Sequence, residues 1–242
     1  MEKVNIEDCL ESVRSRITDA AESSVRNFDD ITLVAVSKTR TPEEINTAID
    51  CGVTDIGENK VQEILDKYDS VKPVKWHMIG HLQTNKVRYI VDKVDLIHSV
   101  DSLKLAKEID KRVGAIGKTM DILIQINPAD EESKFGVSLE EVRVLIEEIL
   151  GSCGNIRIKG LMSVAPKVDN PEDVKPFFDK VKSKYDELSR IDNEKLDFKY
   201  LSMGMSHDFE VAIECGANIV RVGSAIFGER DYGQFRKEQE EK

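Results

Sequence analysis

The chain has 242 residues, a length that fits either one large α/β domain or two small ones, each able to bury a core. Its 35 basic and 46 acidic residues give a formal net charge of −11, which argues against a general nucleic-acid-binding surface. Any site for an anionic ligand must therefore be built locally. The charged amino terminus and the lack of a run of roughly 20 apolar residues predict a soluble, cytoplasmic protein with no signal peptide and no membrane span.

A helix is predicted first, over residues 6–24, ahead of any strand. Short β-rich runs then alternate with longer amphipathic runs through most of the chain. The predicted strands cover residues 31–37, 55–57, 76–79, 96–99, 121–126, 158–162, 200–203 and 219–222, and a helical pattern follows each of them.

Several predicted helices begin with residues that cap helices. Thr41 precedes a proline and two glutamates, which is a typical helix start. We expect Asp101 to cap the helix over residues 101–114, and Ser138 with Glu141 to form a capping box for the helix over residues 138–151. A single long helix is predicted over residues 170–188.

Eight β-then-α units in a chain of this length predict a single closed (β/α)8 TIM barrel with an additional N-terminal helix. An open doubly wound sheet is the alternative, because counting units does not prove closure. The first helix is expected to plug the bottom of the barrel or to pack on its side. We predict one domain over residues 1–242, with a core of about 31–232 and a solvated charged tail over residues 235–242.

In such barrels the active-site residues lie at the carboxyl ends of the strands and in the loops that follow. Applied to the predicted strands, this rule gives a set of polar residues that converge on one rim. These residues are Lys38, Glu58, Asn59, His81, Asp101, Asn127, Ser163, Ser202, Ser206, Arg221 and Ser224.

The loops after the last two predicted strands have the composition of a phosphate site. They read "SMGMSHD" and "RVGSAIFG", and their small residues let backbone N–H groups approach a phosphate. The candidate phosphate contacts are Ser202, Ser206, Gly223 and Ser224. A structural alternative stays open, in which Ser206 caps the following helix and the glycines serve tight turns.

Lys38 and Arg221 extend this prediction to a cofactor. A lysine in a dry pocket has a lowered pKa and can form a Schiff base. Pyridoxal 5′-phosphate (PLP) needs separate anchors for its aldehyde and its phosphate, and Lys38 lies across the predicted rim from the phosphate loops. Arg221 near the pyridine nitrogen would donate a hydrogen bond and keep the ring unprotonated, which damps carbanion chemistry.

Several motifs taken together resemble the YggS/PROSC family of pyridoxal phosphate homeostasis proteins. They are "AVSKTR", "GENKVQE", "WHMIGHLQTNK", "KFG", "GLM" and "LSMGMSHDFEVAIECGANIVRVGSAIFG". The resemblance covers nearly the whole chain and implies a fold similar to the N-terminal barrel of alanine racemase. It also implies a protein that carries PLP and supplies it to apoenzymes, without established catalytic turnover.

The resemblance also implies roles for individual residues. Lys38 would form the internal aldimine, and Arg221 would face the ring nitrogen. Ser202, Ser206, Gly223 and Ser224 would hold the phosphate, with Asn59 and Met203 beside the cofactor, and Lys134 would be a rim lysine that helps in cofactor handling. Arg40 departs from the family, which often has lysine there; a guanidinium cannot form an aldimine, so any second-lysine role would be lost.

Other functions remain open at this point. A PLP-dependent enzyme acting on amino acids, such as a weak racemase, is the main alternative, although no tyrosine matches the racemase base from a second domain. A lysine-dependent aldolase without a cofactor is the third. No catalytic residue and no metal site are assigned, and a monomer is expected. His77 and His98 are interpreted as structural, and His81 as a rim residue. Cys9, Cys51, Cys153 and Cys215 are expected to be free thiols.

Overall fold

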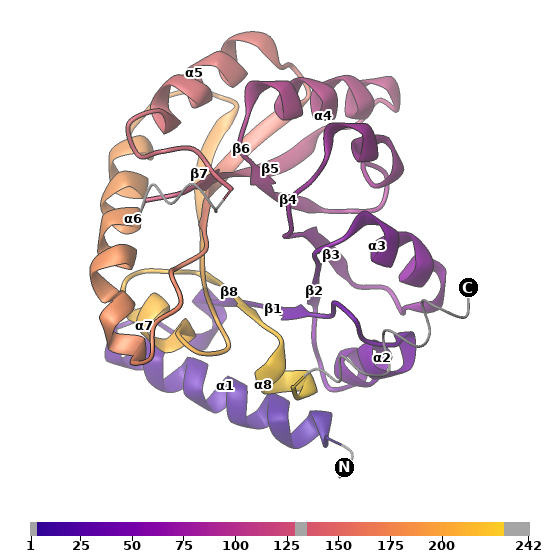
Figure 1. Ribbon diagram of the computed structural model, residues 1–242, viewed down its shortest axis with the longest axis vertical. Helices are drawn as coiled ribbons and strands as arrows, with labels where there is room; N and C mark the ends of the chain where they lie inside the picture. The colour runs from indigo at the N-terminus through magenta and orange to yellow at the C-terminus, as the bar shows by residue number, and fades with distance from the viewer. Residues whose placement is uncertain (1–3, 129–134, 230–242) are drawn as a thin grey trace.

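The computed structural model describes residues 4–128 and 135–229. In this part of the chain eight parallel strands close into a barrel in the order β1 to β8, with the helices outside them (Figure 1). β8 pairs with β1 over Thr32 to Ala35, which closes the sheet and confirms the predicted (β/α)8 barrel. The strands are β1 Thr32–Val36, β2 Asp55–Glu58, β3 Lys75–Met78, β4 Leu96–Val100, β5 Met120–Ile126, β6 Ile156–Ser163, β7 Leu196–Met205 and β8 Ile219–Val222.

The helices between the strands vary in length and type. β3 is followed by a 3-10 helix rather than an α-helix. The α-helices are α1 Ile6–Ser23, α2 Pro42–Asp50, α3 Val61–Lys67, α4 Leu103–Ala115, α5 Val142–Ser152, α6 Lys175–Leu188, α7 Phe209–Glu214 and α8 Ser224–Phe227; the 3-10 helices are η1 Phe28–Asp30, η2 Tyr68–Ser70, η3 Thr84–Tyr89 and η4 Pro171–Val174. None of these helices has both the length and the apolar content needed to cross a membrane.

Helix α1 packs on the side of the barrel and does not plug its bottom. It lies against α7, α8 and α2, as Figure 1 shows. Leu10, Val13 and Ile17 form its buried stripe at helical spacing. Arg16 on its outer side forms an ion pair with Glu210 of α7. The side-packing alternative is therefore the correct one.

Two predicted helix starts are wrong and one is confirmed. Thr41 and Glu44 form the expected capping box at α2. Asp101 does not cap α4, because the Ser102 side chain accepts the N–H of Leu105 instead. Ser138 and Glu141 do hydrogen-bond each other, but they form a turn ahead of α5.

The predicted helix over residues 170–188 is two elements. η4 ends at Val174 and α6 begins at Lys175, with Pro176 in its first turn. Proline has no N–H to donate to the preceding turn, so the ladder of α-helical hydrogen bonds is interrupted there.

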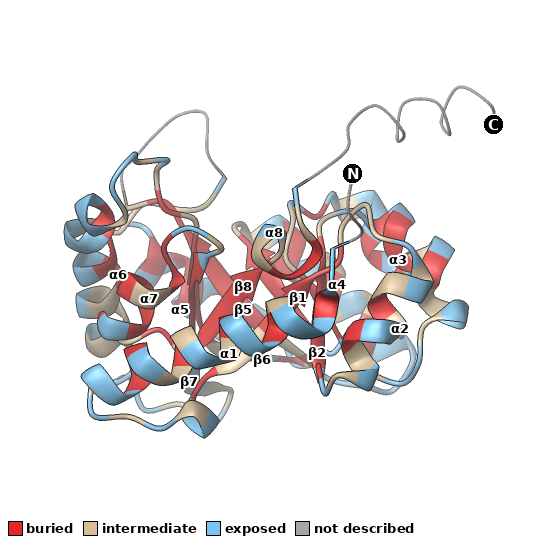
Figure 2. Cartoon of the chain, turned by 90° about the horizontal axis from the view of Figure 1, so that it is seen from below, coloured by how far each residue is buried: buried red, intermediate tan, exposed pale blue. Residues whose placement is uncertain are grey.

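The buried residues lie on the strands and along one side of the helices (Figure 2). They form two parts of the core, one between the strands and the helices and one inside the barrel. Alternate strand residues face inward, so the interior is lined from every second position. Its apolar part contains Val34, Leu96, Leu123, Met162 and Ile219. Buried polar side chains occupy other parts of the barrel. Lys134, the last residues of the predicted core and the charged tail lie outside the described residues.

Candidate functional site

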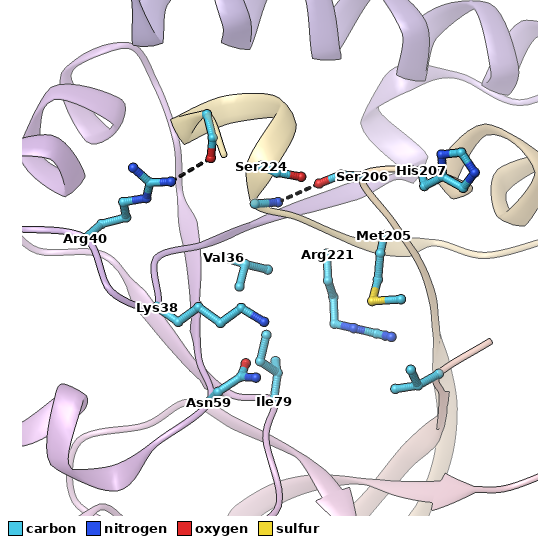
Figure 3. Close-up of a pocket in the computed structure, with 13 residues that line it drawn as sticks. Val36, Lys38, Arg40, Asn59, Ile79, Met205, Ser206, His207, Arg221 and Ser224 are labelled. Atoms are coloured by element: carbon cyan, nitrogen blue, oxygen red, sulfur yellow. Dashed lines mark hydrogen bonds between the residues drawn. The ribbon is translucent and has the colours of Figure 1, made fainter. Parts of the chain in front are cut away.

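A cavity of about 420 Å³ opens at the carboxyl ends of the strands (Figure 3). Loops and strand ends that are far apart in the sequence contribute to it, as expected for this fold. The structure brings six of the eight predicted binding residues together there. The lining residues are Val36, Lys38, Arg40, Asn59, Ile79, Val164, Met205, Ser206, His207, Arg221, Gly223, Ser224 and Gly228.

Lys38 lies in the turn that follows β1. The Arg40 N–H closes this turn on the Ser37 carbonyl at 3.0 Å. The Lys38 side chain is half-buried and points into the cavity toward Arg221 (Figure 3). The next residue, Thr39, has φ of 65°, an unfavourable conformation for a β-branched residue. The backbone beside the lysine is therefore strained and needs support from its surroundings.

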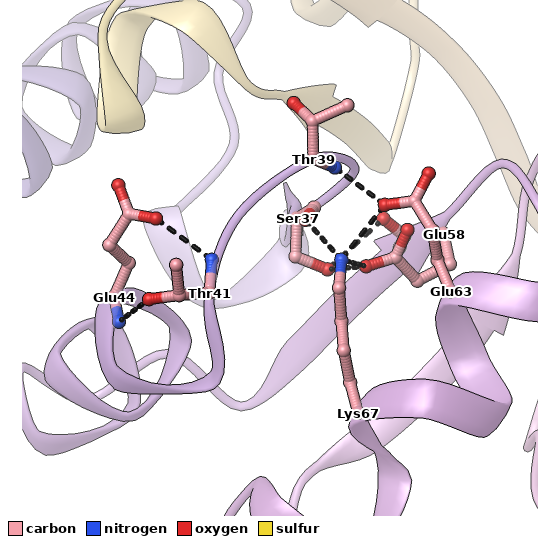
Figure 4. Close-up of polar contacts among 8 residues, drawn as sticks. Ser37, Thr39, Thr41, Glu44, Glu58, Glu63 and Lys67 are labelled. Atoms are coloured by element: carbon pink, nitrogen blue, oxygen red, sulfur yellow. Dashed lines mark hydrogen bonds and ion pairs between the residues drawn. The ribbon is translucent and has the colours of Figure 1, made fainter. Parts of the chain in front are cut away.

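That support comes from a group of side chains beneath the turn, which we call the Lys67 cluster (Figure 4). The Lys67 ammonium donates to the Ser37 carbonyl at 3.0 Å, to Glu58 at 2.8 Å and to Glu63 at 2.9 Å. Glu63 in turn accepts the Thr39 N–H at 2.5 Å. The cluster thus fixes the backbone on both sides of Lys38.

Glu58 is the most deeply buried carboxyl of the Lys67 cluster. Its Oε1 accepts from Ser37 and Lys67, whereas its buried Oε2 has no hydrogen-bond partner. Burial raises the pKa of Glu58 to about 7, and the nearby Lys67 charge only partly opposes this. The sequence placed Glu58 at the rim but missed Glu63 and Lys67. Their i,i+4 spacing was the available signal.

Arg221 enters the cavity from β8 and is almost fully buried. It donates to the Ser202 hydroxyl at 2.6 Å and to the Ser163 carbonyl at 2.8 Å. Burial lowers the pKa of Arg221 to about 10, with Asp208 opposing the shift, so the guanidinium stays charged at neutral pH. Its two fixed contacts leave further guanidinium N–H groups for a ligand in the cavity.

Ser202 and Met203, both expected beside the ligand, do not line the cavity. Ser202 faces the barrel interior, is fully buried and lies beneath Arg221. Met203, the next residue, faces outward and packs in the core under the helices. β7 continues to Met205, so Met205 and His207 reach the cavity instead. Strand alternation places Ser202 inward and Met203 outward, and an irregularity in the pairing with β8 between Ser202 and Met205 brings Met205 to the cavity.

The loops after β7 and β8 meet at the first turn of α8. The Ser206 hydroxyl accepts the N–H groups of Gly223 at 3.1 Å and Ala225 at 3.4 Å. Ser206 does not cap α7, whose N-cap is Asp208, so this part of the structural alternative is wrong. Gly204 has φ of 93°, and a Cβ there would lie 2.6 Å from the Ala212 side chain. The small residues therefore fit a tight approach between these loops.

Arg40 links the turn after β1 to the end of α8. Its guanidinium donates to the Gly228 carbonyl at 2.6 Å and lies 3.5 Å from the Glu44 carboxylate. It also lies over the Phe227 ring. The residue that departs from the family pattern thus has a bracing role at the edge of the cavity.

The remaining rim candidates lie apart from this cavity. His81 stacks on Phe135 with ring centroids 3.9 Å apart, and its Nδ1 is 3.9 Å from Asp101. It borders a neighbouring hollow that shares Asn59 with the main cavity. The described part of the chain contains no group of three or more His, Cys, Asp or Glu side chains that could hold a metal ion.

A lysine after the first strand of a closed eight-stranded barrel and a buried arginine on the last strand face one cavity. The family model described as alanine racemase, N-terminal domain, matches residues 11–231. The chain belongs, within this class, to the family of pyridoxal phosphate homeostasis proteins. The protein of that name from Aquifex aeolicus is 48% identical over 225 residues, which are 92% of this chain and 97% of the relative. The Escherichia coli protein is 37% identical over 240 residues, 93% and 97% of the two chains.

Solved structures agree with this assignment. PipY of Synechococcus elongatus with PLP bound is 30% identical, with a TM-score of 0.79, and the match covers 93% of this chain and all of PipY. A Bifidobacterium adolescentis protein is 33% identical, with a TM-score of 0.86 and coverage of 93% and 98%. D-threonine aldolase from Filomicrobium marinum, at 17% identity and a TM-score of 0.70, shares the fold; the match covers 90% of this chain and 60% of the aldolase.

Proposed function

We propose that this chain binds PLP in the cavity at the carboxyl ends of the strands and takes part in PLP homeostasis. The observation that carries the proposal is that Lys38 and the buried Arg221 line one cavity with the hydroxyls of Ser206 and Ser224. PipY, a relative, was solved with PLP bound.

The chemistry of the lining fits an anionic cofactor. Three cationic side chains, Lys38, Arg40 and Arg221, line the cavity, and its described lining includes no carboxylate. The chain as a whole carries a formal charge of −11, so this cationic set is a local feature. Cationic side chains without a competing carboxylate stabilise a bound phosphate group.

Each anchor has a separate task in this proposal. Ser206, Ser224 and the backbone of Gly223 bind the phosphate: the Ser206 oxygen accepts the N–H groups of Gly223 and Ala225 at the start of α8, and a phosphate oxygen would take its place as their acceptor. The Lys38 amine condenses with the aldehyde to form a Schiff base with loss of water, which makes binding covalent yet reversible. Asn59 lies beside the cofactor.

Arg221 donates a hydrogen bond to the pyridine nitrogen. Since a charged guanidinium offers no acceptor, it keeps that nitrogen unprotonated and weakens the ring as an electron sink. This favours holding the cofactor over carbanion chemistry. We propose that the protein holds PLP and delivers it to apoenzymes. In this arrangement Ser202 acts through Arg221 and does not contact the phosphate.

Absorbance and chemical trapping test the binding. Purified protein titrated with PLP should develop the visible band of a Schiff base, and borohydride reduction should fix pyridoxyl on Lys38, as mapped by mass spectrometry of peptides. Lys38→Ala should lose both signals, whereas Lys104→Ala, which removes an exposed lysine on α4, should keep them. A wild-type protein that takes up no PLP would overturn the proposal.

Amino-acid substrates test whether the site also catalyses. PLP-loaded protein incubated in deuterated water with a panel of amino acids should exchange α-protons no faster than free PLP does. Rapid exchange that depends on Lys38 would replace the carrier function by the racemase-like alternative. Cleavage of aldol substrates without PLP would favour the lysine-dependent aldolase.

A further inference from the structure

A chain of buried side chains crosses the barrel interior beneath the cavity and ends at Arg221. It consists of Asp55, His77, His98, Ser202 and Arg221, which come from β2, β3, β4, β7 and β8, and we call it the buried polar chain. Every member is at most 4% exposed. Because all five lie on strands of a closed barrel, their relative positions are fixed by the backbone.

The contacts run without a gap from one end to the other. His77 Nε2 lies 2.9 Å from Asp55 Oδ1, and His77 Nδ1 lies 2.9 Å from His98 Nε2. His98 Nδ1 lies 3.0 Å from the Ser202 hydroxyl, which accepts from Arg221 at 2.6 Å. A carboxylate and a guanidinium therefore terminate the buried polar chain.

These two ends determine where each proton lies. An ionised carboxylate only accepts, so His77 carries a proton on Nε2, and in its neutral form the ring presents Nδ1 as an acceptor. His98 must then donate from Nε2, which leaves its Nδ1 as the acceptor of the Ser202 hydroxyl proton. The Ser202 oxygen is thereby free to accept from Arg221, which only donates. With both imidazoles neutral, this is the one order of protons that satisfies every contact of the buried polar chain.

The surroundings favour that charge state. Burial, the adjacent His77 and the Arg221 charge all lower the pKa of His98 well below its usual value. Burial alone would raise the pKa of Asp55, but hydrogen bonds from His77 and Thr54 outweigh it and lower the pKa. Lys75 lies 4.0 Å from Asp55 at the outer end and adds to this effect. His98 is thus held in its neutral form between His77 and the Arg221 cation.

We propose that His77 and His98 are positioning residues for the cofactor site, which hold Ser202 as an acceptor and thereby fix Arg221 toward the pyridine nitrogen of PLP. Among the described residues, the other hydrogen bond of Arg221 is to the Ser163 carbonyl. Loss of the Ser202 acceptor leaves the guanidinium free to turn about that contact. Apolar side chains could fill the same space, so packing alone does not require this polar set.

The proposal rests on the function proposed above, and three variants test it. His98→Leu removes the acceptor for Ser202, and Ser202→Ala removes the acceptor for Arg221 with little change in volume. His98→Asn places an amide oxygen close to the position of Nδ1 and keeps the contact with Ser202. Leu96→Ala, on the same strand and also facing the interior, controls for general loosening of the core.

We expect the first two variants to raise the dissociation constant for PLP at least tenfold and to shift the visible band of the bound cofactor. Borohydride should still trap PLP on Lys38 at saturating concentration. His98→Asn should lie within about threefold of wild type, and Leu96→Ala should lower thermal stability without these changes. If His98→Leu does not fold, the PLP affinity and spectrum of Ser202→Ala test the proposal on their own. Equal PLP affinity and spectrum in Ser202→Ala and wild type would overturn the inference.

A second measurement needs no cofactor. Nitrogen-15 NMR of histidine-labelled apoprotein should find His98 neutral at pH 7, and both His77 and His98 should carry a proton on Nε2 and none on Nδ1. Protonation of either ring on Nδ1 would overturn the proton order. Wild-type protein that binds no PLP would refute the proposed function itself, whereas normal binding that is insensitive to Ser202→Ala refutes only the positioning role.

Discussion

The buried carboxyl of Glu58 makes a specific prediction about stability and pH. Its folded pKa is raised from the usual 4.5 to about 7, because the carboxylate is desolvated beneath the turn that bears Lys38. A carboxyl whose folded pKa is raised binds its proton more tightly in the native state, so its stabilising contribution is full below about pH 4.5 and is lost as the pH rises through 7. Since one pKa unit corresponds to about 1.4 kcal/mol, the loss amounts to about 3 kcal/mol at most.

Glu58→Gln removes this titration while it imitates the protonated acid. The amide oxygen can accept from Ser37 and Lys67 as Oε1 does, and the amide nitrogen replaces the unpartnered Oε2. We therefore expect the variant and wild type to be similarly stable near pH 4.5. Between pH 4.5 and 7.5, the unfolding free energy of the variant should rise relative to that of wild type by up to about 3 kcal/mol.

Urea unfolding of the apoprotein measures this difference. The single tryptophan, Trp76, lies buried on β3 and provides a fluorescence signal for unfolding. Subtracting the two curves of unfolding free energy against pH cancels the titrations that both proteins share. A flat difference would contradict the raised pKa. If wild type instead becomes more stable than the variant as the pH rises, the attraction of Lys67 outweighs desolvation and holds Glu58 ionised.

Three further predictions concern other parts of the barrel. Lys67→Met should destabilise the protein by about 3–5 kcal/mol in urea unfolding at pH 8, because it leaves the buried carboxylates of Glu58 and Glu63 without their cation. Adding Glu58→Gln to this variant should recover part of the loss. If the effects of the two substitutions on the unfolding free energy simply add, the coupling between these side chains is contradicted. Gly160→Ala should cost at least about 3 kcal/mol in the same assay, since its Cβ would lie 1.8 Å from the Tyr200 carbonyl oxygen at a φ of 143°. Arg221→Ala should weaken PLP retention at least tenfold in equilibrium dialysis, and unchanged affinity would argue against its placement at the ring nitrogen.

Much of the fold followed from sequence because its signals are local. Strand runs such as the one around Val34 and the capping box at Thr41 depend on residues a few positions apart. The position of α1 did not follow, since its apolar stripe would suit either a barrel end or an outer face. The choice depends on α7 and α8, which lie far away in sequence.

The site residues at β7 illustrate a different limit. The sequence located the strand end near Met203, but the strand runs to Met205. Gly204, which was predicted to lie in the loop after this strand, lies within the strand at a positive φ. Because β7 extends two residues past Met203, Ser202 lies deeper in the barrel than a residue at the end of the strand. Ser202 therefore lies beneath Arg221 and not at the rim, although it is a hydroxyl side chain that faces the barrel interior.

The strand β2 connects the two cationic anchors of the cavity, because its carboxylates lie on opposite faces. Asp55 points into the barrel and ends the buried polar chain that reaches Arg221. Glu58, three residues later and so on the other face, contacts the Lys67 cluster that supports the turn with Lys38. Each anchor is thus supported by a buried network with its own carboxylate, and neither network needs an acidic side chain in the lining of the cavity. Because the two networks share only the backbone of β2, a change in one carboxylate should alter one anchor and leave the other in place.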